Sequence, residues 1–315
     1  MNKLHVFLSI VIMATSVISR AQETPVIFKD FVFKNVTVRK NLLYRNSSIA
    51  GVKEKYCQFD FYEPADDKNH RRPLIIWLHG GGFKFGKKTS GGIPLWGKTF
   101  AQRGYVCASI NYRLSKKHPL KNFEDLVEGC ADAIEDLKQA IDYFKQHAAD
   151  YGIDTNTIIL GGNSAGGMIA LQAAYSNPGQ IKAFVHKSDT TTETYDEQKP
   201  IPVAAAINFW GAMFNLKWLQ NAAVPIVSVH GKKDGIVPYD NKNGIYGSMA
   251  IRRAADSLQI PNAIKLYESY SHELQKHFNP LFAGRPAKKR WLEAGQFVAD
   301  FLYKEVVEKK GKKHH

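Results

Sequence analysis

Short apolar runs alternate with segments of helical periodicity along most of the 315-residue chain, and this alternation limits the fold more than any other feature. Residues 74–78, LIIWL, are continuously apolar, as a strand buried on both faces of a parallel sheet must be. Residues 123–149 carry apolar side chains at helical spacing. Because such alternation is typical of βαβ units around a mostly parallel sheet, the pattern predicts an α/β fold.

The same pattern predicts a sheet of about eight strands flanked by helices. Two strands at the start have no helix between them, so we expect an antiparallel pair at a sheet edge. The predicted strands are 31–39, 55–62, 74–78, 105–112, 157–160, 203–209, 225–229 and 264–267. The predicted helices are 123–149, about 164 to 174, and 287–307.

Residues 1–21 have the composition of an export signal. Lys3 supplies a positive start, a largely apolar stretch follows, and Ser19 and Ala21 put small residues where a signal peptidase reads them. We therefore expect a signal peptide at 1–21, a single mature domain at 22–315, and export to the periplasm or the extracellular space. A buried N-terminal helix is the alternative, but the segment lacks the polar face of such a helix.

Charge and hydropathy exclude two classes of partner. The formal net charge is +14, but no basic run is interleaved with stacking aromatic residues or set in a nucleic-acid-binding motif, so we expect no nucleic acid partner. After the N-terminal segment no stretch of 18 apolar residues occurs, so we expect no stable membrane span once the signal is removed. The oligomeric state is not readable from these patterns.

Three cysteines, Cys57, Cys107 and Cys130, exclude a disulfide framework. Cys107 and Cys130 are either one bridge of an oxidising compartment or two small buried side chains. Two segments stand outside the alternation of strands and helices. Residues 176–200 are predicted to be either an insertion that forms a partial lid or a plain surface loop, and residues 309–315 form a basic tail predicted to be solvated.

The first chemical motif is the pentamer GNSAG at residues 162–166, which fits G-x-S-x-G and lies between a predicted strand and a predicted helix. The turn must be so sharp that the serine is strained, and the outer glycines lack side chains where strand and helix crowd together. The motif predicts Ser164 as a nucleophile. A glycine-rich turn without chemistry has the same pattern, so the prediction depends on companion motifs.

The sequence HGGGF at residues 79–83 is the first companion, directly after a strand predicted to be buried. Its glycines let backbone N–H groups approach a developing oxyanion. We predict the N–H groups of Gly81, Gly82 and Ala165 as the oxyanion hole. A phosphate-binding loop is the alternative, but neither GxGxxG nor a following Gly-Lys-Ser or Gly-Lys-Thr is present.

The acid and the base are predicted from strand ends, where an α/β sheet presents functional groups. Asp234 in HGKKD follows one strand closely, whereas the rival Asp240 lies farther from that strand end. His272 in YSHEL follows the last strand and is predicted to be the base, with His277 ranked second. These residues complete the chain order serine, acid, histidine that is typical of one class of triad.

The set HGGGF, GNSAG, HGKKD and YSHEL, in this order, resembles the α/β-hydrolase superfamily, and specifically its HGGG-type carboxylesterases close to secreted bacterial esterases of the acetyl- and feruloyl-esterase kind. The resemblance covers nearly all of the chain after the signal. It implies an α/β-hydrolase fold and a secreted serine carboxylic-ester hydrolase that acts through an acyl-enzyme on a small-molecule or carbohydrate-linked ester. HGKKD stands where hormone-sensitive-lipase-like members carry an Asp-Pro-Leu motif, which leaves the subfamily and the substrate open.

Two other functions, a serine peptidase and a non-catalytic binding module, are found on the same fold. A secreted serine peptidase of the same fold usually carries a large extra N-terminal domain, and only a short stretch precedes HGGGF here. A non-catalytic binding module of the same fold is opposed by the intact set of motifs. We expect no metal and no cofactor, because neither HExxH nor paired CxxC occurs. Phe83, Phe85 and Trp210 are candidates for a pocket wall or for the core.

Overall fold

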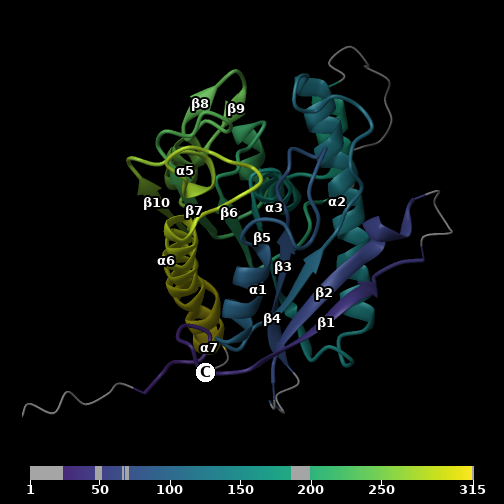
Figure 1. The fold of residues 1–315 in the computed structure, drawn as a ribbon, viewed down its shortest axis with the longest axis vertical. Helices are drawn as coiled ribbons and strands as arrows, with labels where there is room; N and C mark the ends of the chain where they lie inside the picture. The colour runs from purple at the N-terminus through teal and green to yellow at the C-terminus, as the bar shows by residue number, and fades with distance from the viewer. Residues whose placement is uncertain (1–23, 47–51, 66, 68–70, 186–198, 314–315) are drawn as a thin grey trace, which may run out of the picture.

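Eight strands form one sheet in the order β1-β2-β4-β3-β5-β6-β7-β10 (Figure 1). The computed structural model describes residues 24–46, 52–65, 67, 71–185 and 199–313. The edge pair β1 and β2 is antiparallel, β2 pairs antiparallel with β4, and all other neighbours are parallel. The strands are β1 (Val36–Leu43), β2 (Gln58–Pro64), β3 (Arg72–Leu78), β4 (Val106–Ile110), β5 (Ile153–Asn163), β6 (Ala205–Phe209), β7 (Ile226–Gly231) and β10 (Asn262–Tyr267).

Helices cover both faces of the sheet, which confirms the predicted α/β architecture (Figure 1). Apolar side chains of α2, α3, α4 and α5 pack in one core cluster, and those of α1 and α6 pack in a second. The helices are α1 (Ile93–Ala101), α2 (Phe123–Gln146), α3 (Ala165–Tyr175), α4 (Pro178–Val185), α5 (Ser248–Ser257) and α6 (Arg285–Leu302). A two-stranded sheet of β8 (Asn241–Lys242) and β9 (Ile245–Tyr246) lies outside the main sheet.

Strand β3 shows why its sequence is continuously apolar. Leu74, Ile76 and Leu78 belong to the first cluster, whereas Ile75 and Trp77 belong to the second. Successive side chains of a strand point to opposite faces, so a strand covered on both sides has no polar position.

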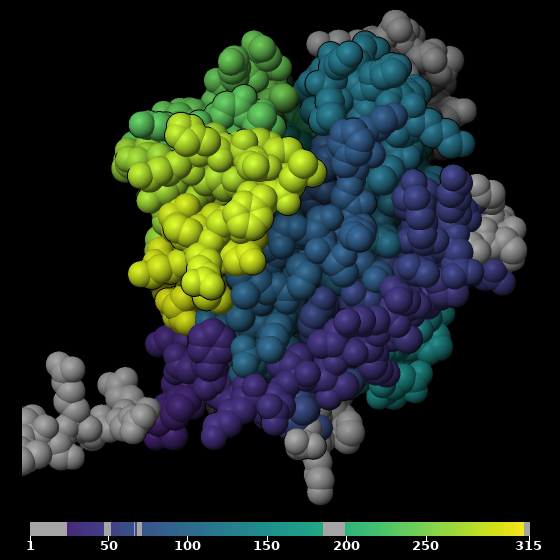
Figure 2. Space-filling model, viewed as in Figure 1, coloured from purple at the N-terminus to yellow at the C-terminus, as the bar shows by residue number. Residues whose placement is uncertain are grey.

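Two predicted boundaries differ from the structure at the chain ends. The first strand was predicted at 31–39, but β1 begins at Val36, because the preceding residues dock elsewhere: the N–H of Phe28 donates to the carbonyl of Arg103, and the Arg103 guanidinium lies over the ring of Phe31. Figure 2 shows this purple segment lying against the yellow C-terminal helix.

The closing helix continues past its predicted end, as η6 (Tyr303–Glu308), a π-helical stretch, and α7 (Lys309–Lys313). The described part of the basic tail is therefore helical. Lys310 Nζ contacts Asp154 and donates to Thr157 Oγ1 at 2.6 Å. This docking corrects the expectation of a wholly solvated tail.

Cys57, Cys107 and Cys130 are free and buried. Cys107 packs in the second core cluster and Cys130 in the first, so the sheet separates them. This explains why the two thiols form no bridge and act as small buried side chains.

The segment predicted as a lid or a loop, residues 176–200, begins with helix α4, which packs into the core. Ile181 on α4 is fully buried, and Lys182 pairs with Glu135 of α2 at 2.7 Å. Residues 186–198, the rest of that segment, lie outside the described residues, as does the predicted signal peptide 1–21. Among the helices that the structure describes, none is long and apolar enough to cross a bilayer.

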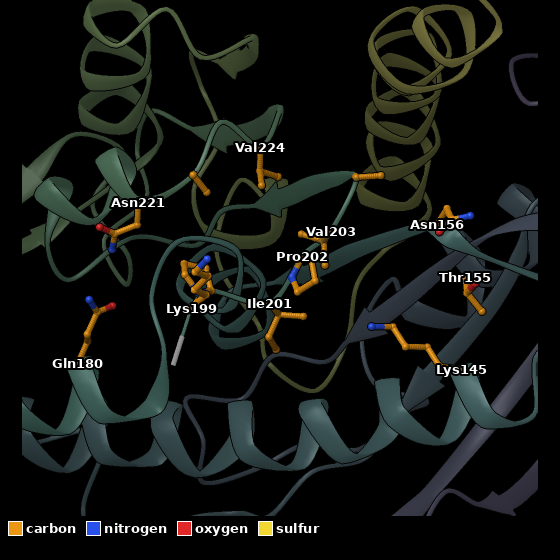
Figure 3. Close-up of a pocket in the computed structure, with 13 residues that line it drawn as sticks. Lys145, Thr155, Asn156, Gln180, Lys199, Ile201, Pro202, Val203, Asn221 and Val224 are labelled. Atoms are coloured by element: carbon orange, nitrogen blue, oxygen red, sulfur yellow. The ribbon is translucent and has the colours of Figure 1, made fainter. Parts of the chain in front are cut away.

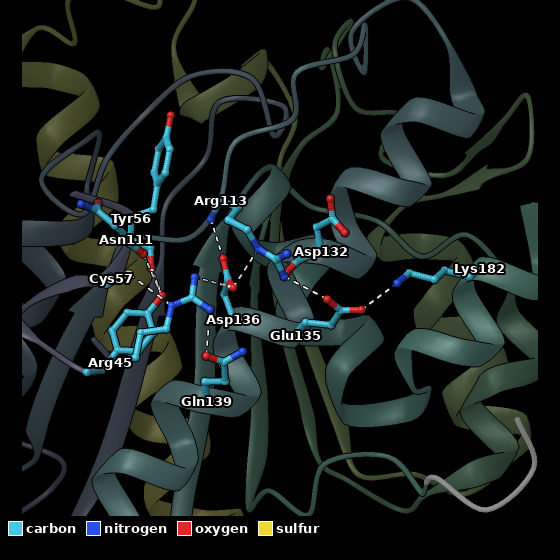
Figure 4. A network of polar contacts seen from close by, with 11 residues as sticks. Arg45, Tyr56, Cys57, Asn111, Arg113, Asp132, Glu135, Asp136, Gln139 and Lys182 are labelled. Atoms are coloured by element: carbon cyan, nitrogen blue, oxygen red, sulfur yellow. Dashed lines mark hydrogen bonds and ion pairs between the residues drawn. The ribbon is translucent and has the colours of Figure 1, made fainter. Parts of the chain in front are cut away.

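A buried ion-pair network joins α2 to the segments that follow β1 and β4 (Figure 4). The carboxylate of Asp136 is fully buried and lies 2.9 Å from both the Arg45 and the Arg113 guanidinium. Asp136 also accepts the backbone N–H of Arg113 at 2.7 Å. Because a buried carboxylate is stable only when paired and hydrogen-bonded, this aspartate fixes the loop after β4 against α2.

Candidate active site

Ser164 lies at the sharp turn between β5 and α3, with φ 54° and ψ −119°. A Cβ atom on Gly166 would meet the carbonyl oxygen of Leu78 at 1.9 Å, and one on Gly162 would meet the Gly166 backbone at 2.4 Å. Side chains are therefore impossible at both positions without moving the backbone. The strain at Ser164 is local and enforced by the packing of strand against helix.

His272 links Ser164 to Asp234. His272 Nε2 lies 3.0 Å from Ser164 Oγ, and His272 Nδ1 donates to Asp234 Oδ2 at 2.7 Å. The side chains of His272 and Asp234 are 3% and 0% exposed. The sequence places these residues far apart, and the strand order brings them together at the carboxyl edge of the sheet.

The carboxylate of Asp234 is held as an anion. Oδ1 accepts the backbone N–H groups of Ile236 and Val237, each at 2.9 Å. Burial alone would raise the pKa of this carboxyl, but its hydrogen bonds with His230 and His272 outweigh burial and hold the pKa well below its usual range. A negative charge fixed beside His272 Nδ1 favours the tautomer that leaves Nε2 free to accept a proton.

The two rival residues lie elsewhere. Asp240 pairs with Arg253 on α5, with one oxygen 3.1 Å from the guanidinium. His277 is exposed. The structure thus brings His272 into contact with Ser164 and Asp234 into contact with His272, whereas the described side-chain contacts of Asp240 are at the surface of α5 and His277 faces solvent.

The HGGG loop passes beside Ser164, the predicted nucleophile. The N–H of Gly80 donates to Asn163 Oδ1 at 3.1 Å, and a Cβ on Gly80 would lie 3.2 Å from the Cβ of Ser164. Gly81 and Gly82 have φ values of 118° and 58°, which favour glycine. Within the described chain, the N–H groups of Gly81, Gly82 and Ala165 donate to no other protein group. They remain available to a ligand oxygen.

His79 supports this loop. Its ring stacks on Tyr112 with centroids 4.2 Å apart, and Tyr112 donates its hydroxyl to the His79 carbonyl at 2.7 Å. Burial lowers the pKa of His79 to about 4, so the ring stays neutral near pH 7. Its place is structural: the buried, neutral ring packs against Tyr112 at the start of the loop.

Two polar residues of the site were not predicted from the sequence. Asn163, which accepts from the HGGG loop, also donates to Glu273 Oε1 at 3.5 Å. Glu273 has φ 54°, and burial raises the pKa of its carboxyl. Trp291 on α6 donates to the Glu273 carbonyl at 2.7 Å. No spacing in the sequence signals the contact between Asn163 and Glu273, because it joins segments 110 positions apart.

The aromatic candidates divide between core and surface. Phe83 and Trp210 are fully buried and belong to the core, whereas Phe85 is 62% exposed. Phe278 packs edge-on against His272, with ring centroids 5.0 Å apart. Leu120, 61% exposed, lies against the HGGG loop, since a Cβ on Gly82 would meet its Cδ2 at 2.2 Å. Apolar groups therefore adjoin both the oxyanion loop and the base.

A pocket of about 800 Å³ lies away from this site (Figure 3). It is bounded by Thr155 and Asn156 near the start of β5 and by Val203 and Ala204 just before β6, which places it toward the opposite edge of the sheet. The described residues contain no group of three histidine, cysteine, aspartate or glutamate side chains placed to hold a metal ion.

The model of the BD-FAE family matches residues 59–221, just over half of the chain. That stretch contains the HGGG loop and the serine turn. Among curated proteins, esterase LipQ of Mycobacterium tuberculosis is 25% identical over 61% of this chain and 50% of its own length. Fumonisin B1 esterase of Sphingopyxis macrogoltabida is 30% identical over 45% of this chain and 27% of its own length. The chain therefore spans half or less of these two relatives.

Solved structures share the fold over nearly the whole domain. Thermogutta terrifontis esterase 2, phosphorylated by paraoxon, superimposes with a TM-score of 0.58 at 22% identity, covering 86% of this chain and 95% of that protein. Similarity at this level shows that the chain has the α/β-hydrolase fold. It does not identify the reaction, because one fold hosts many reactions.

Proposed function

The chain belongs to the BD-FAE family, and we propose that it is a serine carboxylic-ester hydrolase with Ser164, His272 and Asp234 as its triad. One observation carries the proposal: a continuous line of hydrogen-bond contacts runs from Ser164 Oγ through both nitrogens of His272 to a buried carboxylate. The esterases among the relatives support an ester as the substrate class.

Each residue has a role that follows from its contacts. His272 Nε2 takes the proton of Ser164 as Oγ attacks the ester carbonyl, and it later returns that proton to the leaving alcohol. Asp234 keeps the proton of Nδ1 in place and stabilises the imidazolium. Water then attacks the acyl-enzyme by the same route and releases the acid and free Ser164.

The free N–H groups of Gly81, Gly82 and Ala165 are the proposed donors to the tetrahedral oxyanion. One such donor contributes about 3 kcal/mol to transition-state stabilisation, because it is oriented before the charge develops. Helix α3 begins at Ala165, so its positive N-terminal end acts in the same direction.

The ester is proposed to be an uncharged small-molecule or carbohydrate-linked ester. The exposed Phe85 and Leu120 on or beside the oxyanion loop, together with Phe278 at the base, favour an apolar group next to the scissile bond. A series of nitrophenyl esters of increasing acyl length, compared with acetylated and feruloylated sugars, measures this preference. Peptide nitroanilides in the same assay separate the esterase from a peptidase of this fold.

The nucleophile is tested by Ser164→Ala. We expect this variant to lose ester hydrolysis and labelling by a fluorophosphonate while keeping its fold by circular dichroism. Ser176→Ala is the matched control, because Ser176 is also buried, and its hydroxyl donates to the Gln172 carbonyl on α3, away from His272. Full ester hydrolysis by folded Ser164→Ala would overturn the proposed function.

We also propose export, on the composition of residues 1–21. N-terminal sequencing of protein recovered outside the cytoplasm should then begin at Gln22. A mature protein found in the cytoplasm with Met1 intact would contradict this.

A further inference from the structure

A second histidine lies on the carboxylate of the triad. His230, near the end of β7, is fully buried, and its Nε2 is 3.3 Å from Asp234 Oδ2, the same oxygen that accepts from His272. His230 Nε2 is also 3.1 Å from the carbonyl oxygen of Val237, and its Nδ1 is 2.8 Å from Ser248 Oγ. Every nitrogen of this ring therefore has a partner.

The partners determine which nitrogen carries the proton. An ionised carboxylate and a carbonyl can only accept hydrogen bonds, so Nε2 of His230 carries the proton, which it donates to the Val237 carbonyl at 3.1 Å and shares with Asp234 Oδ2 at 3.3 Å. Nδ1 then accepts from the hydroxyl of Ser248. A neutral ring with its proton on Nε2 satisfies all three contacts.

Asn208 extends these hydrogen bonds one residue farther from the site, through Ser248. The side chain of Asn208 is oriented because its Oδ1 accepts the N–H of Gly211 at 2.8 Å. Asn208 Nδ2 then donates to Ser248 Oγ at 3.1 Å, which leaves the Ser248 hydroxyl to donate to His230. Asn208 and Ser248 are 0% and 1% exposed. Donors thus point in one direction, from Asn208 through Ser248 and His230 to Asp234.

We propose that His230 is a positioning residue for the acid of the triad, and that Ser248 orients His230 for this task. The inference rests on the proposed function, in which Asp234 orients His272. It adds a residue that takes part in no proton transfer: in the contacts described, His230 touches neither Ser164 nor His272 Nε2.

The carboxylate geometry shows what His230 adds. Asp234 receives four donors: two backbone N–H groups on Oδ1, and His272 and His230 on Oδ2. The first three are full hydrogen bonds, and the N–H of His230, shared with the Val237 carbonyl, occupies the remaining side of Oδ2, so each side of the carboxylate faces a donor. Without His230, Oδ2 keeps a single partner, and the plane of the carboxylate toward His272 is less restrained.

The test compares two substitutions at His230. In His230→Gln the amide nitrogen reaches about as far as Nε2 and retains the donor, whereas His230→Leu removes it. We expect His230→Leu to lower kcat, and the rate of fluorophosphonate labelling at Ser164, by about 10- to 100-fold, by analogy with the loss seen when a residue that orients a metal ligand is removed. KM should change little, and His230→Gln should recover most of the rate.

Ser248→Ala is the second variant, because it breaks the same line one residue farther away and stays informative if His230→Leu does not fold. Ser176→Ala, a buried serine outside the line, is its matched control. Ser248→Ala should label more slowly than Ser176→Ala at equal thermal stability.

The outcomes separate this inference from the proposed function. Wild-type kcat in folded His230→Leu, equal losses in His230→Leu and His230→Gln, or equal labelling rates in Ser248→Ala and Ser176→Ala would overturn the positioning role alone. If instead Ser164→Ala keeps full activity, the triad itself is wrong. A loss of kcat that His230→Gln restores, with a loss of labelling specific to Ser248→Ala, establishes the role.

Discussion

Asp234→Asn is the sharpest test of the triad, because the surroundings of this side chain dictate how the amide must sit. The two backbone N–H groups that now bind Oδ1 require an acceptor there, so the amide oxygen takes that place and the NH₂ group replaces Oδ2. The NH₂ group then faces His272 Nδ1, which is a donor in the native protein. Two donors cannot bond, so His272 must move its proton to Nε2.

This change of tautomer removes the base from Ser164. Nε2 would then present N–H to the serine oxygen 3.0 Å away and could no longer accept its proton. The comparable change in a serine protease lowers kcat by about 10⁴-fold. At 1.36 kcal/mol for each factor of ten, this corresponds to about 5 kcal/mol of transition-state stabilisation. The backbone contacts of residue 234 survive, and His230 Nε2, which now faces the NH₂ group, keeps the Val237 carbonyl as its acceptor, so stability should change less than activity.

The assay is the hydrolysis of a neutral nitrophenyl ester, with kcat and KM determined separately and thermal unfolding recorded for each variant. Asp240→Asn is the control, since Asp240 pairs with Arg253 at the surface and should keep wild-type activity. A loss below about tenfold in folded Asp234→Asn, or an equal loss in Asp240→Asn, would refute the tautomer argument.

Three further predictions follow from the same contacts. Gly166→Ala should lower activity by at least about 100-fold in the ester assay, because its Cβ would lie 1.9 Å from the Leu78 carbonyl oxygen and the serine turn must shift to admit it. Asp136→Ala should lower the free energy of unfolding in a denaturant titration by about 3 kcal/mol, the low end for a broken buried pair, because Arg113 keeps its pair with Glu135 and Arg45, 12% exposed, keeps its hydrogen bond with Gln139 and can be hydrated. The Asp234 carboxyl should take up no proton along the acid limb of kcat/KM for a neutral ester, because hydrogen bonding with His230 and His272, against the effect of burial, holds its pKa well below its usual range; a two-proton limb would contradict this.

The architecture was predictable because burial on both faces of a parallel strand demands an apolar sequence. The eight predicted strands all exist, with shifted ends. Helices α1, α4 and α5 and the small β8–β9 sheet were missed. Helix α1 contains Gly97, which packs against the ring of Tyr62, and a glycine inside a helix weakens its pattern. Helix α5 buries few apolar side chains, among them Ile251 and Ala255, so its apolar stripe is narrow.

Asp234 and His272 could be predicted because each follows the end of a strand, but no pattern in the sequence indicates the residues that contact them. His230 reads as one more residue of a buried strand, and its partner Ser248 begins a helix that the pattern did not reveal. Asn163 and Glu273 meet across 110 positions. Side-chain contacts between loops depend on the final packing of strands, so a local pattern carries no signal for them.

The strand order also explains why this chemistry suits this sheet. Strand β5, which carries Ser164, is central: β3 and its HGGG loop lie on one side, and β6, β7 and β10 lie on the other. Asp234 follows β7 and His272 follows β10, so the acid and the base both approach from the side away from the oxyanion loop. An attacking serine must lose its proton on one side while its target carbonyl oxygen gains charge on the other. A parallel sheet with the proposed nucleophile after a central strand meets this demand, because the loops that follow its strands all lie at one end of the sheet. The side chain of Asn163 joins the two sides, since it is hydrogen-bonded to both Gly80 and Glu273.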